Sequence, residues 1–333
     1  MRGSSMTILI LSRRSSLYST RRLIRAGKKR GHKVIVIDPL QCTLALDRGK
    51  PLLYFRRKRL KGIDVVIPRI GSALADYGLS VLAHLEMGGI PVLNPSSAIA
   101  KAKDKFQALQ FLSAHAIDTP RTALVRNPED IDRALKIVGG LPVILKVPQG
   151  THGVGVILAE SRQSVESTLE AFWSIGQDIL IQEFVKESYG RDIRALVLDG
   201  KIVAAMRRHA RVGEFRSNIH KGAIGIPLEL KKSYRNAAIQ AAQVMGLRFA
   251  GIDMLEGKGG PRVVEVNASP GIEGMERVAG KNIAGLIISY AVGLARKKNN
   301  KDLGRRGYLP QSVDAADKPD PAQVVNARAI RTA

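Results

Sequence analysis

The chain has 333 residues, of which 45% are hydrophobic and 25% are charged, a composition typical of globular proteins. Its single cysteine, Cys42, excludes a disulfide scaffold and a multi-cysteine zinc site and fits a reducing cytoplasm. No apolar run approaches the roughly 20 residues of a membrane helix, and no signal-peptide core follows the N-terminus, so we expect no membrane partner. Residues 1–5 have the character of a cloning scar or an alternative start.

The net charge of +24 is concentrated near the N-terminus, where residues 1–62 contain 17 Lys/Arg and 2 Asp/Glu. A field of this sign attracts anionic partners such as nucleic acid, a ribosomal surface or an acidic peptide. A solvated basic surface without a partner is the alternative interpretation.

Apolar strands alternate with helices over the first hundred residues. Strands are predicted at 7–12, 33–39 and 63–71, with a basic helix after the first and an amphipathic helix after the third. This alternation predicts an α/β domain with a parallel sheet. Asp38 ends the second strand, where a dinucleotide-binding fold often places an acid. The first strand, however, leads into SRRSSLYS without the glycine fingerprint, which argues against nicotinamide binding.

From residue 95 onward the pattern becomes α+β. A helix at about 97–115 is followed by two strands within 142–160, a helix, and the strand DILIQEFV. A hairpin turning at Asp199-Gly200, a helix, a second hairpin from Phe249 to Asn267 and a helix at about 282–296 complete the pattern. Beyond Lys298 the polar composition predicts a disordered tail.

Three polar residues occupy the second hairpin, FAGIDMLEGKGGPRVVEVN. Glu265 and Asn267 lie two apart on a strand and therefore share a face, while Val264 and Val266 are expected to face the core. If Leu255 pairs with Val263, Asp253 lies opposite Glu265.

Two carboxylates this close repel each other unless a positive group separates them. Oxygen ligands without His or Cys suit magnesium held partly by substrate phosphates, so Asp253, Glu265 and Asn267 are candidate metal ligands. A pair of exposed acids on a hairpin edge is the alternative.

Cationic and glycine-bearing segments supply candidates for phosphate binding. The segment QGTHGVGV has glycines that can turn backbone N–H groups toward a phosphate, although ordinary hairpin glycines explain it equally well. Lys146 lies within the apolar strand VILKVP, where an unpaired ammonium group is costly; internal pairing is the alternative to a phosphate contact. Arg208, and Arg216 with Asn218 in EFRSNIHKG, could stabilise a transferring phosphoryl group, or provide only surface basicity.

In their order, these segments resemble the ATP-grasp superfamily, most closely its RimK-type alpha-L-glutamate ligases, from Met6 to about Arg296. The motifs that carry the resemblance are ILSRRSSLYS, VIPRIG, AKDK, KVPQGTHGVGVILAE, IQEFVKE with DIR, FRSNIHKG, AGIDML and VVEVNASPGIEG. The resemblance implies a pre-ATP-grasp α/β domain at 6–98, a central ATP-grasp lobe at 99–182, a C-terminal lobe at 183–298 and a tail at 299–333.

The resemblance also implies roles for individual residues. ATP phosphates would contact Lys105 and Lys146, the adenine hinge would contain Glu183 and Phe184, and Asp192 would engage the nucleotide. The phosphate and substrate region would be lined by Arg216, Ser217 and Asn218, with Arg208 and Arg216 as catalytic arginines. The metal, two Mg²⁺ ions with Mn²⁺ as an alternative, would be held by Asp253, Glu265 and Asn267.

The implied reaction phosphorylates a substrate carboxylate with ATP and lets the amine of free L-glutamate attack the acyl phosphate, with the QGTHGVG loop as a lid. The acceptor would be the C-terminus of a ribosomal small-subunit protein or a poly-glutamate chain, in a cytoplasmic homo-oligomer. Two departures from the family pattern bear on substrate contacts: HKGA replaces HRGG, and His209 stands where arginine is common.

Two rival functions remain open at this stage. One is glutamate ligation to a deazaflavin or pterin cofactor, or amino-acid ligation to a carrier protein. The other is a non-catalytic nucleic-acid-binding protein, for which LYFRRKRLK is the best feature because it mixes aromatic and basic residues. The intact set of oxygen ligands argues against a decayed enzyme.

Overall fold

The computed structural model describes residues 4–71, 75–148, 155–211, 213–214 and 222–306. The N-terminal region forms the predicted parallel sheet, in the order β2 (Lys33–Ile37), β1 (Thr7–Leu11) and β6 (Val65–Pro68). Alternate residues of β1 enter two different cores. Ile8 and Ile10 pack with α1 (Tyr18–Lys29), whereas Leu9 and Leu11 pack with α2 (Ala75–Met87). Because both faces are covered, the strand is apolar throughout.

A small antiparallel sheet, which the sequence analysis did not predict, follows β2. It contains β3 (Cys42–Asp47), β4 (Lys50–Phe55) and β5 (Lys58–Arg59). Its second turn places Arg56 and Arg57 at φ of 47° and 67°, a left-handed backbone that usually favours Gly or Asn. Arg56 is held by a 2.7 Å hydrogen bond from its Nε to Gln41 and lies over the Phe55 ring. The turn therefore presents exposed basic side chains.

The helix expected at about 97–115 is two helices, so this prediction is wrong. α3 (Ser96–Lys103) ends at Asp104, which has an extended backbone and begins α4 (Lys105–Ala114). The Asp104 side chain accepts a 2.9 Å hydrogen bond from the Gln107 amide, an N-cap that restarts the helix. The break places Lys105 in the first turn of α4, where its amide donates to Pro148 O.

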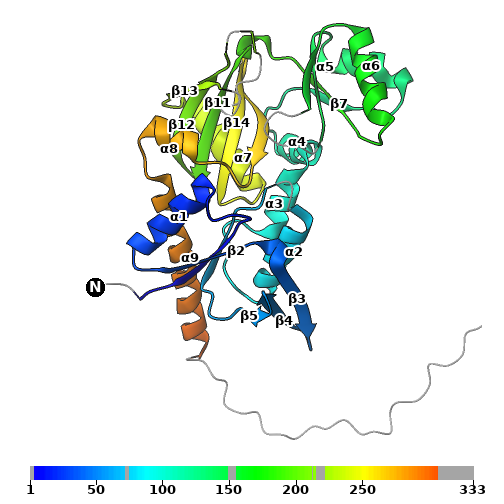
Figure 1. The fold of residues 1–333 in the computed structure, drawn as a ribbon. Coiled ribbons are helices and arrows are strands. Elements are labelled where there is room, and N and C mark those ends of the chain that lie inside the picture. The colour runs from blue at the N-terminus through cyan, green and yellow to red at the C-terminus, as the bar shows by residue number, and fades with distance from the viewer. Residues whose placement is uncertain (1–3, 72–74, 149–154, 212, 215–221, 307–333) are drawn as a thin grey trace, which may run out of the picture. The chain divides into compact units, whose positions relative to one another are not determined.

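The central lobe is an antiparallel sheet with two helices on one face. Its strands run in the order β7 (Thr122–Leu124), β10 (Leu180–Glu183), β8 (Val143–Lys146) and β9 (Val156–Ala159). The helices α5 (Ile131–Val138) and α6 (Arg162–Trp173) share one buried cluster with this sheet (Figure 1). Within the described residues, short 3₁₀ turns lie at Pro39–Gln41, Pro128–Asp130 and Lys186–Ser188.

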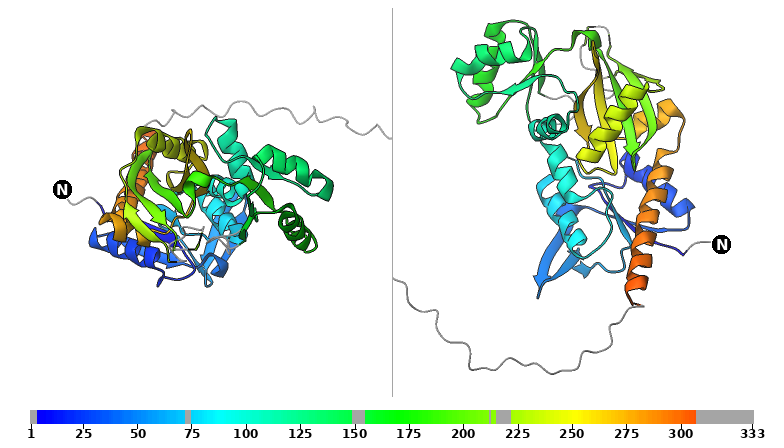
Figure 2. Two further views of the ribbon diagram at one scale, coloured as in Figure 1. Left: turned by 90° about the horizontal axis from the view of Figure 1, so that it is seen from above. Right: turned by 180° about the vertical axis from the view of Figure 1, so that it is seen from behind.

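The C-terminal lobe is an antiparallel sheet that carries the candidate site. Its order is β13 (Ile224–Pro227), β12 (Lys201–His209), β11 (Arg191–Leu198), β14 (Phe249–Gly257) and β15 (Gly260–Asn267). The helix α7 (Lys232–Val244) covers one face (Figure 2). The turn at Asp199-Gly200 is confirmed, with φ of 51° and 69°.

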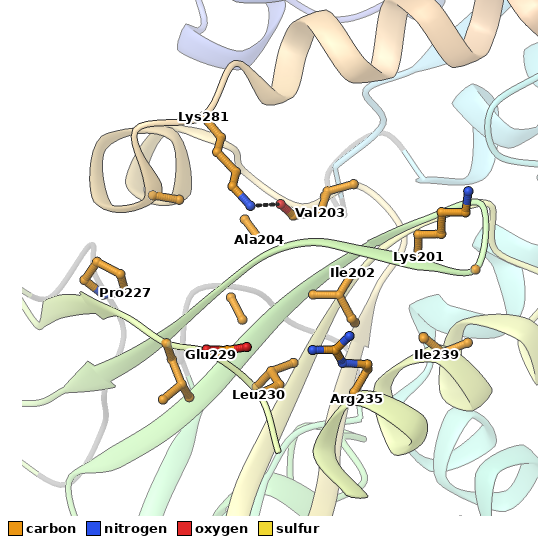
Figure 3. A pocket seen from close by; sticks show the side chains of 14 residues that line it. Lys201, Ile202, Val203, Ala204, Pro227, Glu229, Leu230, Arg235, Ile239 and Lys281 are labelled. Carbon is orange, nitrogen blue, oxygen red and sulfur yellow. Dashed lines mark hydrogen bonds between the residues drawn. The ribbon is translucent and has the colours of Figure 1, made fainter. Parts of the chain in front are cut away.

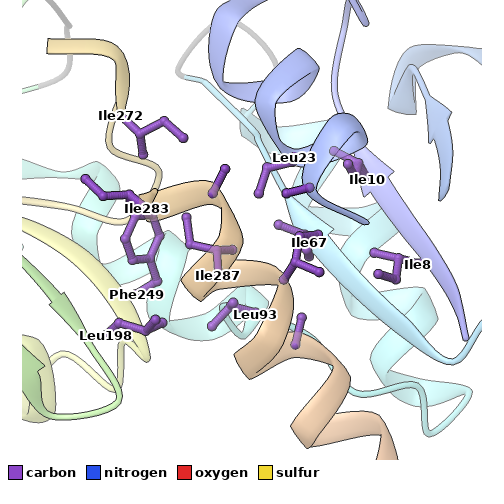
Figure 4. Packing of buried hydrophobic residues seen from close by; sticks show 14 of the residues in the cluster. Ile8, Ile10, Leu23, Ile67, Leu93, Leu198, Phe249, Ile272, Ile283 and Ile287 are labelled. Atoms are coloured by element: carbon purple, nitrogen blue, oxygen red, sulfur yellow. The ribbon is translucent and has the colours of Figure 1, made fainter. Parts of the chain in front are cut away.

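The opposite face of this sheet is divided in two. At one end, Leu198 and Phe249 pack against α9 (Ile283–Arg306), which also contacts the N-terminal sheet (Figure 4). The short helix α8 (Glu273–Ala279) lies beside the same core. At the other end, the face turns polar. The core thus holds the N-terminal domain against one half of the sheet and leaves the other half for polar groups.

The C-terminal helix extends farther than the sequence predicts, because α9 continues beyond Lys298 to Arg306. In the described part of the chain, no single helix is long and apolar enough to span a membrane. Together, α8 and the first part of α9 satisfy the length and composition criteria, but they are bent by 114°.

Candidate active site

The hairpin of β14 and β15 places the predicted carboxylates opposite each other. Asp253 pairs with Glu265, as expected. The premise for this prediction is wrong, however, because Leu255 pairs with Arg262 and a register shift follows Asp253. A β-bulge inserts one extra residue and turns the strand locally.

The bulge also corrects the predicted core of this strand. Val263 and Val266 are buried, whereas Val264 is only partly buried and lies at the irregularity. A strict two-residue alternation cannot describe a strand with one inserted residue. The insertion allows Val263 and Val266 both to face α7 while Glu265 stays on the polar face.

Asp253 is the centre of a buried ion-pair network. Arg194 lies opposite it on β11 and donates a 2.6 Å hydrogen bond from Nε to Oδ1, while Arg208 approaches Oδ2 at 3.0 Å. Burial alone would raise the pKa of Asp253, but the two guanidinium groups outweigh it and lower that pKa to about 2. The positive groups that keep Asp253 ionised are thus supplied by the protein itself.

Arg208 joins Asp253 to Asp192. It is buried on β12 and donates a 2.6 Å hydrogen bond from Nε to Asp192 Oδ1, together with a second bond from Nη2. Burial opposes its charge, but the carboxylates of Asp253 and Asp192 raise the pKa of Arg208 above its ordinary value. Asp192 was predicted to engage the nucleotide and Arg208 to stabilise the transferring phosphoryl group; in this structure the two residues are paired with each other.

Glu265 differs from Asp253 because it makes no hydrogen bond or ion pair with another described residue. Asn267, two residues on, has a buried Nδ2 without an acceptor in the described part of the chain. This orphaned amide indicates that a further polar group belongs at the end of β15.

The candidate metal ligands supply only part of the coordination that a divalent cation needs. Within the described ranges, no group of three His, Cys, Asp or Glu side chains is arranged to hold a metal. The predicted set has two carboxylates and one amide oxygen, and one of those carboxylates is shared with arginines. A hard cation such as Mg²⁺ therefore needs phosphate oxygens or water to complete its coordination here.

Two lysines from other elements face the same group of acids. Lys146, at the end of β8, donates from Nζ to Gln182 Oε1 at 2.6 Å. Burial lowers its pKa to about 8, while Glu265 opposes this shift and Lys105 adds to it. Burial likewise lowers the pKa of Lys105, again against the field of Glu265. The structure thus brings Lys105, Lys146 and Glu265 into one electrostatic neighbourhood.

The two residues of the predicted adenine hinge, Glu183 and Phe184, contact side chains outside this cluster. Glu183, at the end of β10, accepts hydrogen bonds from Arg121 at 3.1 Å and Arg262 at 3.0 Å. Phe184 packs edge-on against Tyr189 with ring centres 6.0 Å apart. Arg216, Ser217, Asn218 and the glycine loop at 149–154 lie outside the described residues.

A buried amide missed by the sequence analysis fixes the chain after β15. Asn94 Oδ1 accepts from the Arg248 and Phe249 amides at 2.8 and 2.7 Å, and its Nδ2 donates to Phe249 O and Ala268 O at 2.6 and 2.9 Å. All four hydrogen-bonding positions of the amide are used. An asparagine at the end of an apolar segment, PVLN, was the only signal in the sequence.

Gly251 contributes to the same arrangement. A Cβ at this position would lie 2.8 Å from Pro270 Cβ, so only glycine lets the segment after β15 pack this closely.

A pocket of about 610 Å³ elsewhere in the lobe, lined by Lys201, Arg235, Lys281 and Glu229 among others, includes none of the predicted site residues (Figure 3).

Comparison with known proteins agrees with this architecture. The model of the RimK PreATP-grasp domain matches residues 6–99, and that of the RimK-like ATP-grasp domain matches residues 102–291. A protein of Thioalkalivibrio sulfidiphilus (strain HL-EbGR7), named "Probable alpha-L-glutamate ligase", is 46% identical over 300 residues, covering 90% of this chain and 100% of that protein.

Solved structures share the fold at lower identity. The ATP-grasp ligase PsnB complexed with minimal precursor, Mg and ADP has a TM-score of 0.67 and 20% identity, covering 88% of this chain and 99% of PsnB. D-alanine–D-alanine ligase from Bacillus anthracis, complexed with ATP, has a TM-score of 0.63 and 20% identity, covering 90% and 100%.

The fold and the domain matches define an ATP-dependent ligase of the ATP-grasp class. Within that class, the chain belongs to the RimK-like ATP-grasp family, which confirms the resemblance inferred from its motifs.

Proposed function

We propose that the protein joins the amine of L-glutamate to the C-terminal carboxylate of a ribosomal small-subunit protein or of a poly-α-glutamate chain. The observation that carries this proposal is Glu265, which faces Asp253 across the hairpin and has the buried ammonium group of Lys146 in its field. The name of the Thioalkalivibrio relative supports glutamate as the substrate.

The nucleotide would lie between the central and C-terminal lobes. Lys105 and Lys146 would contact its phosphates, and Glu183 and Phe184 would border the adenine. The neighbours that hold ATP, or Mg and ADP, support this assignment. One or two Mg²⁺ ions, or Mn²⁺, held by Asp253, Glu265 and Asn267, would supply charge neutralisation at the phosphates. Arg208 would keep Asp192 and Asp253 ionised and correctly oriented.

The reaction would proceed in two steps. An oxygen of the acceptor carboxylate attacks the γ-phosphorus of ATP, ADP leaves, and an acyl phosphate forms. The neutral amine of glutamate then attacks the acyl carbon, phosphate leaves, and the amine loses a proton as the amide forms. Lys146 would hold the transferring phosphoryl group in the first step, because its ammonium group lies in the electrostatic field of Glu265, Asp253 and Asp192 and is partly desolvated.

The acceptor is proposed to be a peptide with an acidic character. The precursor bound in the PsnB structure supports a peptide acceptor. The basic surface of the N-terminal domain, including Lys58, Arg59 and the Arg56-Arg57 turn, supports an anionic one, since it would raise the local concentration of a polyanion.

Mass spectrometry after incubation with ATP, Mg²⁺ and glutamate tests this function. The experiment compares reactions with no acceptor, a ribosomal small-subunit protein, a short α-glutamate peptide and a pterin or deazaflavin. A ladder of glutamyl additions on the protein or the peptide is expected. Product on the cofactor alone would favour the small-molecule rival. ATP consumption without glutamyl product from any acceptor would contradict the proposal.

A further inference from the structure

Arg69 is a cation at the edge of the N-terminal sheet that the proposed function has not yet used. It directly follows β6, and its amide donates to Leu11 O at 2.8 Å, so it lies at the carboxyl ends of β1 and β6. In open α/β sheets, ligands bind outside these strand ends. Arg69 therefore lies at the edge of the sheet where a ligand is expected.

The Arg69 side chain reaches the segment that directly follows β15, the strand of Glu265 and Asn267. Its Nη2 donates to Pro270 O at 2.8 Å. Pro270 is three residues after Asn267, and three residues of extended chain span at most about 10 Å. The segment between them is fixed by Asn94 and by the close packing of Pro270 on Gly251. Arg69 is thus held near the end of β15 by a rigid frame.

Among the described residues, the charge of Arg69 has no partner of opposite sign. Burial lowers its pKa to about 10, and no acid among the described residues lies within ion-pair distance of it. Arg22, Arg194 and Arg208 each contact a carboxylate, whereas the partly buried Arg248, like Arg69, donates to a backbone carbonyl, Val92 O, at 3.0 Å. A desolvated cation is normally compensated by an anion. Nearby, the Asn267 amide also lacks an acceptor in the described part of the chain.

We propose that Arg69 binds a non-reacting carboxylate of the incoming glutamate and thereby positions its amine, an inference that rests on the function proposed above. Glutamate brings two carboxylates that take no part in the reaction, and a guanidinium group can bind either in a bidentate manner. ATP is a less suitable occupant, because Lys105 and Lys146 form the cationic group beside Glu265 and come from other elements.

The acceptor carboxylate is also less suitable. It must meet the γ-phosphate next to Lys146, whereas Arg69 approaches from the N-terminal domain, beyond Asn267. Glutamate, as the second substrate, needs its own site within reach of the acyl carbon. The end of β15 meets this need, because it lies next to the candidate metal ligands and near Arg69.

Steady-state kinetics of the intact protein with Arg69→Lys and Arg69→Met test the inference. We expect the KM for glutamate to rise on the order of 10- to 100-fold in Arg69→Met, by less in Arg69→Lys, and the KM for ATP to stay unchanged. The matched control is Arg133→Met, which removes an exposed arginine on α5 and should change neither constant.

Substrate analogues separate a binding role from a structural one. Glutamine lacks the side-chain carboxylate of glutamate, and glutamate α-amide lacks the α-carboxylate. The wild type should prefer glutamate over the analogue that lacks the carboxylate bound by Arg69. Arg69→Met should lose that preference. Arg69→Lys can keep the bond to Pro270 O and guards against a folding defect, which thermal unfolding will reveal.

Two results would overturn the inference. If both variants keep the wild-type KM for glutamate and the wild-type preference, Arg69 does not bind the amino acid although the proposed function stands. If the wild type transfers no glutamate to any acceptor, the proposed function fails and takes this inference with it.

Discussion

The described part of the chain contains two buried acid–arginine clusters that differ in one respect. In the first, Glu276 of α8 accepts hydrogen bonds from Arg22, Tyr18 and the Ala284 amide, at 2.7, 3.1 and 3.0 Å. These contacts fasten α1, α8 and α9 together. Both carboxylate oxygens of Glu276 are used by the protein itself, as expected of a structural cluster.

The second cluster, Asp192, Arg194, Arg208 and Asp253, is as well paired as the first. It differs because Glu265 and the Asn267 amide border it without a hydrogen-bond partner among the described residues. Buried ion pairs alone therefore do not identify an active site. Unsatisfied polar groups beside such a network are the better indication, because they need a ligand.

The largest expected effect is a loss of ligase turnover on substitution beside the second cluster. Glu265→Gln should lower ligase turnover roughly a thousandfold, because losing a metal ligand removes several kcal/mol of charge stabilisation. Its free energy of unfolding should change by less than about 0.5 kcal/mol, since no described hydrogen bond is lost. Turnover and urea unfolding measure both quantities, with the exposed Glu229→Gln as the control. Near-normal turnover would show that Glu265 holds no metal.

The converse change tests the structural cluster. Glu276→Gln should lower the free energy of unfolding by about 2–3 kcal/mol, because Arg22 loses its charged partner and a buried network is weakened. Turnover per folded molecule should stay the same. Urea denaturation and active-site-normalised rates measure the two effects. A loss of turnover in folded protein would mean that this cluster also serves the reaction.

The pH dependence of ATP affinity sharpens the comparison within the second cluster. The pKa of Lys146 is about 8 in the free protein, and bound phosphate should raise it, because an anion favours the charged form. Lys146 is thus charged below pH 8 and neutral above it, so ATP affinity should fall by up to about tenfold per unit above that pH.

Fluorescent-nucleotide titrations from pH 6.5 to pH 9.5, a range set to bracket the Lys146 pKa of about 8, measure this change. Lys146→Arg stays charged over this pH range and should therefore flatten the pH profile of ATP affinity. Glu265 and Lys105, the neighbouring charges that influence the pKa of Lys146, are unchanged in this variant. An unchanged alkaline decline in Lys146→Arg would assign it to another group.

The smallest effect concerns cations that belong to neither cluster. Arg57→Glu with Arg59→Glu should lower kcat/KM for a polyglutamate acceptor about two- to fivefold at low salt and hardly at high salt, because steering by exposed charges is screened. The same charge reversal at Arg133, in the central lobe, is the control. Equal losses at both salt concentrations would point to direct contact instead of steering.

Sequence reasoning recovered most of the elements but missed the break at Asp104, the sheet of β3 to β5 and the extension of α9 to Arg306. The parallel sheet and both C-terminal hairpins follow from apolar patterning and from Asp199-Gly200. The break at Asp104 was missed because the apolar pattern continues through α3 and α4, and only the cap reveals it. The sheet of β3 to β5 was missed in part because its second turn uses Arg56 and Arg57 where glycine or asparagine is usual.

The sequence by itself determined which chemical groups this protein contains and in what order, including oxygen ligands on one strand face and a lysine, Lys146, within an apolar strand. Only the tertiary structure decided how they are paired. The bulge after Asp253, the two arginines on that carboxylate and the approach of Arg69 to Pro270 depend on contacts between residues far apart in the chain. Local propensity carries no information about such contacts, because burial and charge partners are set when the domains pack together.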